Sequence, residues 1–429
     1  MRLSFIYSRF LKLLAIALLT NQFTQLSAIA NPSTPEPVNS PTSTTVQESP
    51  KALVDEVWQI VKSAYIDGKF NQQDWNVIRQ RYLNRSYGSD EEAYQAIREM
   101  LNLLDDPFTR FIDPVAYKKL QRSSDDVAGI GLQLTNDQET KVVTIIEPIQ
   151  NSPAQKAGIL PKDIITTIDG RPVERKAVDE VVTLLKGNVG TYVTLGIIRN
   201  GQPLTFRIQR ANIEIIPVQY RAEETAIGRV GYIRLVEFSS TAAENMKTAI
   251  KALEKQNVKG YVFDLRSNPG GLLGASIDIT RMWLDQGIII SMIDRNGIQD
   301  LMQANNRALT QKPLVILING DSASASEIVA AALQENKRAS LVGTRTIGYN
   351  SIQSVRAVQN GSGLAVTIAK WLTPTGRDIN RTGINPDVVV ELTDSQQQNL
   401  FRDRKIGTIA DPQFAKALEI LNQKLRTSR

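Results

Sequence analysis

The chain has 429 residues, with 50 Lys and Arg against 44 Asp and Glu, and it contains no cysteine and no histidine. These two absences exclude disulfides, thiol nucleophiles, imidazole or thiolate metal ligands and a Ser-His-Asp triad. Any catalytic base must then be a lysine, a carboxylate, a tyrosine or a terminal amine.

Residues 1–30 have the pattern of a secretory signal peptide. A basic stretch ends at Lys12, the apolar run LLAIALLT follows, and Ala28 and Ala30 fit the small-residue rule for cleavage. The apolar run is too short to span a bilayer as a helix, so we expect export, with an uncleaved anchor as the alternative. Residues 31–50 are rich in Pro, Ser and Thr, and this composition predicts a disordered linker.

Residues 51–120 predict an N-terminal helical region. Apolar residues recur at helical spacing from Leu53 onward, and Ser89 with Glu92 forms a capping-box pair ahead of a further apolar stripe.

Residues 125–212 change to a mostly β pattern. Short β-like runs alternate with turn signals such as Asn200-Gly201, and one helical stretch interrupts them. This pattern predicts a compact β module of roughly 90 residues inserted in the chain.

Residues 213–400 alternate between strand and helix patterns. Buried strand candidates such as GYVFDL and PLVILIN are followed by helical stretches, which predicts a largely parallel sheet with crossover helices. Residues 401–429 add an amphipathic C-terminal helix through Phe414 and Leu418. The sequence therefore predicts a multidomain α/β protein.

The first segment that suggests chemistry is Gly129-Ile130-Gly131-Leu132, which opens the β module. Glycines at such a place let backbone N–H groups converge on an anion such as a peptide's C-terminal carboxylate, although a tetrapeptide of this kind is more often a simple strand entry. Ser152-Pro153-Ala154 and Ala157-Gly158-Ile159 follow it. The whole string resembles a PDZ domain of the bacterial protease type.

The second segment is Asn268-Pro269-Gly270-Gly271, directly after the GYVFDL strand. Ligands of open α/β sheets bind beyond the carboxyl ends of the strands, and a Pro-Gly-Gly turn there can aim a backbone N–H outward as half of an oxyanion hole. An ordinary tight turn is the alternative.

The third segment is Ser322-Ala323-Ser324-Ala325-Ser326-Glu327, between the PLVILIN strand and a helix. A serine at this point lies at the positive end of the helix dipole, where a developing oxyanion is stabilised. The alternative is structural, because Ser324 and Glu327 also make an S-x-x-E capping box.

Together, the order of these segments resembles the carboxyl-terminal processing peptidases, or tail-specific proteases, from about residue 51 to 395. Two further segments support the resemblance, DDPFTRF from Asp105 and TPTGRDI from Thr373. The resemblance implies a protease that cuts exported proteins near their C-termini, with a Ser-Lys dyad on a crotonase- or ClpP-like α/β core that carries an inserted PDZ domain. It assigns the nucleophile to Ser324, the oxyanion donors to the backbone N–H groups of Gly270 and Ala325 with Gly271 beside them, and peptide binding to residues Gly129 to Leu132.

The family's lysine lies 25 residues after the serine and is followed four residues later by an orienting glutamine. In this chain the lysine position holds Tyr349, while the glutamine is present as Gln353. A lysine base is neutral only when burial lowers its pKa, whereas burial raises the pKa of a phenol. A tyrosine at neutral pH is therefore a hydrogen-bonding partner rather than a base.

Two functions follow from these observations. The chain is either an exported processing endopeptidase that uses Tyr349 in some way, or an inactive relative that binds apolar protein C-termini as an adaptor. No ligand spacing or phosphate loop indicates a metal or organic cofactor, and the small, spread charge excess argues against nucleic acid. The resemblance points to the periplasm or thylakoid lumen, and it leaves peripheral membrane association and oligomeric state open.

Overall fold

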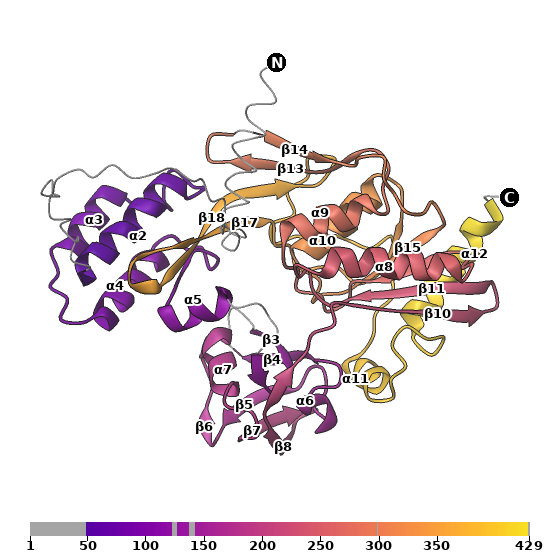
Figure 1. The fold of residues 1–429 in the computed structure, drawn as a ribbon, viewed down its shortest axis with the longest axis horizontal. Helices are drawn as coiled ribbons and strands as arrows, with labels where there is room; N and C mark the ends of the chain where they lie inside the picture. The colour runs from indigo at the N-terminus through magenta and orange to yellow at the C-terminus, as the bar shows by residue number, and fades with distance from the viewer. Residues whose placement is uncertain (1–48, 122–126, 137–141, 298, 428–429) are drawn as a thin grey trace, which may run out of the picture. The chain divides into compact units, whose positions relative to one another are not determined.

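The computed structural model describes residues 49–121, 127–136, 142–297 and 299–427 (Figure 1). The predicted signal peptide and all but the end of the linker lie outside these residues. The described chain forms two compact units. The first combines residues up to 121 with 294–296 and 351–370, and the second contains the rest. No helix within the described ranges has the length and hydropathy needed to cross a membrane.

The first unit is a helical bundle joined to antiparallel strands. Its elements are α2 (Pro50–Ala64), α3 (Trp75–Leu83), α4 (Asp90–Asn102), β1 (Arg110–Ile112), α5 (Pro114–Gln121), β17 (Ser351–Ala357), η2 (Gln359–Gly361) and most of β18 (Gly363–Leu372). The predicted helical region is confirmed, and the Ser89 hydroxyl accepts the Glu92 N–H at 3.3 Å as the capping pattern requires. The pairing of β18 with both β1 and β17 was not predicted.

The second unit begins with the β module, whose elements are β2 (Val127–Gly129), β3 (Leu132–Asn136), β4 (Val143–Pro148), α6 (Pro153–Lys156), β5 (Ile164–Ile168), β6 (Arg171–Pro172), α7 (Val178–Leu185), β7 (Tyr192–Arg199), β8 (Gln202–Gln209) and β9 (Ala211–Ile213). The main sheet has the order β3-β4-β5-β7-β8, so β3 and β8 are its edge strands. A separate apolar core fills this module, with Ile145, Val181, Val193 and Leu195 fully buried.

The α/β core of the second unit is a six-stranded sheet in the order β10-β11-β12-β15-β16-β19. These strands are β10 (Val218–Thr225), β11 (Gly228–Leu235), β12 (Tyr261–Asp264), β15 (Leu314–Ile318), β16 (Ser340–Gly343) and β19 (Val388–Val389). From β11 onward neighbouring strands are parallel, which confirms the predicted crossover topology.

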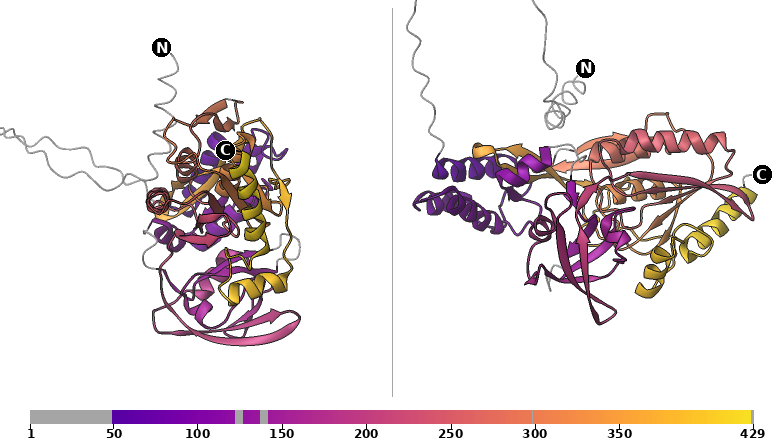
Figure 2. Two further views of the ribbon diagram at one scale, coloured as in Figure 1. Left: turned by 90° about the vertical axis from the view of Figure 1, so that its right-hand side faces the viewer. Right: turned by 60° about the horizontal axis from the view of Figure 1, so that its bottom comes forward.

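Helices cover both faces of this sheet (Figure 2). They are α8 (Ala242–Lys255), α9 (Leu273–Arg281) and α10 (Ala325–Glu335) on one face and α12 (Pro412–Thr427) on the other, with α11 (Asp394–Arg402) and the hairpin of β13 (Ile288–Asp294) and β14 (Gln299–Gln303) beside them. Successive strand residues point to opposite faces, so Val262 and Val315 pack with Phe414 of α12. The covered faces make β12 and β15 fully buried, which explains their continuous apolar runs.

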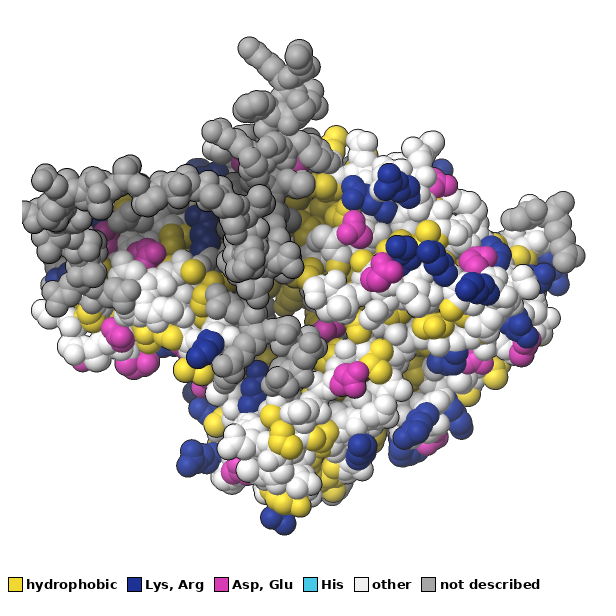
Figure 3. Space-filling view, viewed as in Figure 1, with side chains coloured by type: hydrophobic (Ala, Val, Ile, Leu, Met, Phe, Trp, Pro, Cys, Tyr) yellow, Lys and Arg dark blue, Asp and Glu magenta, His cyan; other side chains and the backbone are white. Residues whose placement is uncertain are grey.

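Basic and acidic side chains are interspersed over the face of the molecule in Figure 3, in line with the balanced composition. On this face, side chains of one charge sign do not gather into a field that would mark a binding site.

Candidate active site

Two turns meet at the carboxyl edge of the core sheet. The glycine turn (residues 265–271) follows β12, and the serine turn (residues 319–324) follows β15. β12 and β15 are parallel neighbours, with Asp264 opposite Leu317, so both turns leave the sheet at the same edge. A Cβ placed on Gly270 would lie 2.9 Å from the Ser324 Cβ. The structure therefore brings together Gly270 and Ser324, two of the residues that the sequence assigned to one site.

The outer serines of Ser322-Ala323-Ser324-Ala325-Ser326 hold these two turns together. The Ser322 hydroxyl donates to the Leu265 carbonyl at 2.8 Å, and the Ser326 hydroxyl donates to the Asn268 carbonyl at 2.9 Å. Both side chains are almost completely buried. Their hydroxyls are used in these structural contacts, and Ser324 is the one of the three serines that is only half-buried.

Ser324 itself has a strained backbone. Its φ of 52° and ψ of −111° lie in a region that non-glycine residues rarely occupy, and such strain is typical of functional turns. Ser324 ends the serine turn, and α10 begins at Ala325, so the serine lies at the positive end of the helix. One half of the capping box predicted from Ser324 and Glu327 is present as a hydrogen bond, because the Glu327 carboxylate accepts the Ser324 N–H at 2.8 Å, so a capping role of this pair is compatible with a functional role of the serine.

Two backbone N–H groups beside Ser324 are free to bind an oxyanion. Within the described chain, the N–H groups of Gly271 and Ala325 donate to no acceptor. The N–H of Gly270, which the sequence analysis assigned as the first donor, instead donates to the Asn268 side-chain oxygen at 2.9 Å. Of the two adjacent glycines, Gly271 is thus the one whose N–H remains available.

Glu327 joins the serine turn to the loop that carries residue 349. Its Oε2 accepts the N–H groups of Ser324 at 2.8 Å and of Tyr349 at 2.9 Å. Its Oε1 accepts the Gly348 N–H at 2.7 Å and the Thr346 hydroxyl at 2.5 Å. Burial raises the pKa of Glu327 although these four donors oppose the shift. One carboxylate oxygen therefore holds the backbones of residues 324 and 349 next to each other.

Sequence reasoning assigned Glu327 only a capping role. An S-x-x-E pattern is satisfied by a local cap, and nothing in the sequence indicates that the same carboxylate also binds a loop 21 residues downstream. The spacing from Ser324 to Tyr349 was the single available signal, and it came from the family resemblance.

The loop around Tyr349 is anchored on its other side as well. Gly348 has a φ of 97°, and a Cβ there would lie 2.6 Å from the Ile379 carbonyl oxygen. The buried Asn350 donates to the Trp371 carbonyl at 3.0 Å and to the Asp378 carboxylate at 2.9 Å. The backbone that positions residue 349 is therefore complete even though the side chain is not a lysine.

Gln353 lies in β17, which belongs to the first compact unit. Its side-chain amide donates to the Ser351 carbonyl at 3.0 Å on the same strand. The role that the resemblance gives it, orienting the base at position 349, stays a prediction.

A buried ionic network lies on the other side of the glycine turn. Arg266 binds Asp264 at 2.6 Å and Asp411 at 2.8 Å, and the Tyr232 hydroxyl donates to Asp264 at 2.7 Å. Burial works to raise the pKa of Asp264, but the Arg266 guanidinium brings it below its usual value. Asp411 and Gln413 stand at the start of α12, so this network fixes the glycine turn against the C-terminal helix. No local sequence pattern indicates this network.

The β module contains the predicted carboxylate-binding motif at the start of β3. Gly131 has a φ of 77°, and a Cβ there would lie 2.4 Å from the Ser152 Cβ. The Ser152 hydroxyl donates to the Gly131 carbonyl at 3.1 Å, and the Ala154 N–H donates to the Ile130 carbonyl at 2.8 Å. The Ile130 side chain is buried in the module's core, so this residue can offer a ligand only its backbone.

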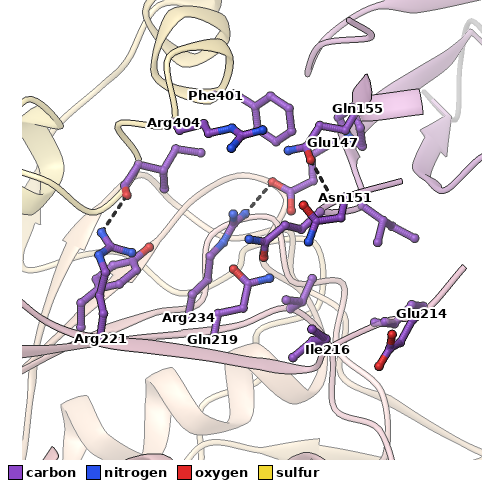
Figure 4. A pocket seen from close by; sticks show the side chains of 17 residues that line it. Glu147, Asn151, Gln155, Glu214, Ile216, Gln219, Arg221, Arg234, Phe401 and Arg404 are labelled. Carbon is purple, nitrogen blue, oxygen red and sulfur yellow. Dashed lines mark hydrogen bonds and ion pairs between the residues drawn. The ribbon is translucent and has the colours of Figure 1, made fainter. Parts of the chain in front are cut away.

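A cavity of about 160 Å³ lies in the second unit. Figure 4 shows the side chains that line it, which come from β4, α6, β10, β11, α11 and the segments beside them. Arg234 and Glu147 form a buried ion pair of 2.5 Å at its wall, and burial raises the pKa of Glu147 despite the guanidinium. None of the described residues lining it belongs to the serine or glycine turn.

Comparison with known proteins supports the assignment of both modules. The family described as Peptidase family S41 matches residues 229–390, and the PDZ domain family matches residues 128–209. The carboxyl-terminal-processing protease of Synechocystis sp. is 41% identical over 387 residues, which cover 89% of each chain. The chloroplastic C-terminal processing peptidase of Tetradesmus obliquus is 37% identical and covers 80% of this chain and 78% of its own. The solved photosystem II D1 C-terminal processing protease matches with a TM-score of 0.69 and 36% identity, covering 80% of this chain and 93% of its own.

Proposed function

This chain belongs to the carboxyl-terminal processing proteases of peptidase family S41, and we propose that it is an exported member that captures apolar protein C-termini but hydrolyses them far more slowly than a Ser-Lys enzyme. The observation that carries this proposal is Tyr349 at the position of the family's lysine, held beside Ser324 by the Glu327 carboxylate.

The chemical argument concerns the first proton transfer. A serine hydroxyl attacks a peptide carbonyl only if a base accepts its proton. A neutral lysine can do this, whereas a protonated phenol near pH 7 cannot, because its own ionisation lies near pH 10. Removing one member of a catalytic dyad or triad typically leaves only about 10³–10⁴-fold enhancement over water, supplied by the oxyanion hole and binding. Peptide hydrolysis at that level is very slow.

The capture of C-termini rests on the PDZ domain. β3 is an edge strand of the domain's sheet, and α7 lies against it. An extended peptide can add to such an edge as a further strand, with its terminal carboxylate at the turn before β3. The positive φ of Gly131 and the hydrogen bond that its carbonyl accepts from Ser152 fix the shape of that turn.

Export to the periplasm or thylakoid lumen is part of the proposal. It is supported by the signal-like pattern of residues 1–30 and by similarity to cyanobacterial and chloroplastic processing proteases.

Capture is tested by fluorescence anisotropy with labelled peptides that end in apolar residues. We expect the free-acid peptide to bind and the amidated peptide to bind at least about tenfold more weakly, because the amide removes the charge that the turn recognises. Gly131→Ala should abolish this preference through its clash with Ser152. Gly170→Ala is the matched control, since Gly170 also has a positive φ of 75° but no atom within 4 Å of its Cβ position. Equal binding of acid and amide would contradict the proposal.

The intact serine and glycine turns favour a second candidate, in which the natural chain is an active endopeptidase. A cleavage time course with an unstructured protein decides between the two. If the natural chain cleaves the protein and Ser324→Ala does not, the chain is an enzyme. If neither the natural chain nor Ser324→Ala cleaves it, the result supports the binding role.

A further inference from the structure

Asn268 connects three segments around the candidate oxyanion hole. It is completely buried. Its side-chain nitrogen donates to the Leu235 carbonyl at the end of β11 at 2.8 Å, and its side-chain oxygen accepts the Gly270 N–H at 2.9 Å. Its main-chain carbonyl accepts the Ala323 N–H at 3.1 Å and the Ser326 hydroxyl at 2.9 Å. This one residue thus touches the sheet, the glycine turn and the serine turn.

We propose that Asn268 is a positioning residue that aims the Gly271 N–H at the oxyanion and sets its distance from the Ala325 N–H. This inference rests on the proposed function, in which the serine turn keeps a working oxyanion hole without a base. Asn268 does not contact substrate in this proposal, because its side chain is hydrogen-bonded to the Leu235 carbonyl and to the Gly270 N–H.

The physical reason is the choice between two adjacent peptide planes. Gly270 and Gly271 have φ values of 102° and 139°, which glycine adopts without a steric penalty. Their peptide planes are therefore easy to rotate unless a hydrogen bond fixes them. Asn268 fixes the peptide plane between Pro269 and Gly270 by accepting the Gly270 N–H. The Phe238 N–H fixes the next plane, between Gly270 and Gly271, by donating to the Gly270 carbonyl at 2.9 Å. With both held, Gly271 is the glycine whose N–H is left for a ligand.

Removal of the Asn268 side chain should release this arrangement. The Gly270 N–H would lose its acceptor in a buried place, and the turn would rotate to find another. A misdirected oxyanion donor typically costs about 10²–10³-fold in transition-state stabilisation. The remaining anchors, from Ser322 and Ser326 to main-chain carbonyls, would keep the two turns attached.

A peptide boronic acid tests the inference in the full-length natural chain without requiring a base to act during turnover. The Ser324 oxygen bonds to boron, its hydroxyl proton passes to water, and the tetrahedral adduct gives a distinct boron-11 NMR signal. We expect Asn268→Ala to weaken the adduct at least about tenfold while PDZ binding of the free-acid peptide is unchanged. Ser324→Ala should give no adduct.

Asn336→Ala is the matched control. Asn336 also donates through its side chain to two main-chain carbonyls, of Ile288 at 2.8 Å and Ala332 at 2.7 Å, but it lies at the far end of α10, about 18 Å from Ser324 along the helix. It should leave the adduct unchanged while lowering stability by a similar amount.

A further variant separates positioning from simple loss of stability. Asn268→Asp keeps the acceptor for Gly270, and when protonated it also keeps a donor for Leu235. Burial raises the pKa of such a carboxyl, so adduct affinity in this variant should fall as the pH rises, whereas the natural chain should show no such fall. Circular dichroism at each pH confirms that the variant stays folded.

The results distinguish this inference from the proposed function. Equal adduct affinity in the natural chain and Asn268→Ala overturns the inference and leaves C-terminus capture intact. An absent adduct in the natural chain also overturns it, because the serine turn would then hold no oxyanion hole. If the natural chain proves to be an active protease, the proposed function fails, and the inference then requires Asn268→Ala to lower kcat with KM unchanged.

Discussion

The candidate site has a serine side, which is the serine turn, and a base side, which is the loop at residue 349. Both keep the hydrogen bonds that position their backbones, but only the serine side also keeps the side chain that the family has at its site. The serine turn retains the strained backbone of Ser324, its two hydroxyl anchors and a helix N-terminus. The loop at residue 349 retains its backbone anchors to Glu327 and Asn350, yet it presents a phenol where the family has an amine. The difference teaches that backbone positioning and proton transfer are separable, since a loop can stay in place after the group that it carried has changed.

The strongest way to break the serine side is Gly270→Ala. The new Cβ would lie 2.9 Å from both the Ser324 Cβ and the Ala323 carbonyl oxygen, on a backbone with a φ of 102°. We expect about a hundredfold loss of boronate affinity and more than about 1 kcal/mol loss in unfolding free energy, measured by urea denaturation. Gly274→Ala, inside α9 with open space around its Cβ position, should instead be neutral or stabilise by up to about 1 kcal/mol. Equal effects of the two changes would contradict the packing of Gly270 against Ser324.

The sequence indicates one part of this site much better than the other. Buried apolar runs such as GYVFDL and PLVILIN predict parallel strands. The turns that follow two neighbouring parallel strands meet at the same edge of the sheet. That reasoning brings Gly270 to Ser324 without a structure. It cannot reveal which glycine N–H stays free, because the answer depends on the Asn268 rotamer and not on the residue types.

The parts that sequence reasoning missed depend on contacts between distant residues. Arg266 meets Asp411 across 145 positions, and Phe111 pairs with Leu364 in a sheet of the first unit. Local patterns of hydropathy carry no information about such partners. Glu327 was missed for the opposite reason, since its local capping role already explained its presence.

Glu327→Gln tests the carboxylate that joins the serine turn to the loop at residue 349. Four donors face the carboxylate, so an amide NH₂ in its place would point at a donor, at a cost of about 1–3 kcal/mol in unfolding free energy. Glu99→Gln, at a side chain that is 56% exposed and pairs with Arg85, should cost less than about 1 kcal/mol.

The penalty of Glu327→Gln should also depend on pH. Because burial raises the pKa of Glu327 in the folded state, its contribution to stability is largest below the ordinary value of 4.5 and falls as the pH rises through the raised value. Glutamine does not titrate, so the difference between the two proteins should shrink as the pH rises. A difference that grows with pH would contradict the assigned direction of the shift.

The smallest expected effect sharpens the distinction between anchoring and reacting serines. Ser326→Ala removes one hydrogen bond to the Asn268 carbonyl, and we expect about 1 kcal/mol loss of stability with only a few-fold weaker boronate adduct. Ser276→Ala serves as the control, since Ser276 is equally buried but donates within α9 to Leu273 at 2.7 Å. It should cost similar stability and leave the adduct unchanged. If Ser326→Ala abolished the adduct as Ser324→Ala does, the distinction between an anchoring and a reacting serine would be contradicted.

The most direct test of the central claim is a cleavage time course that compares the natural chain with Tyr349→Lys on an unstructured protein with an apolar C-terminus. If the anchors at residue 349 are complete and only the base is missing, the variant should cut at least about a hundredfold faster than the natural chain, and Ser324→Ala in the variant should abolish the gain. Equal rates in the natural chain and the variant would contradict the account, because either the phenol would already serve the reaction or the loop would not present residue 349 to Ser324.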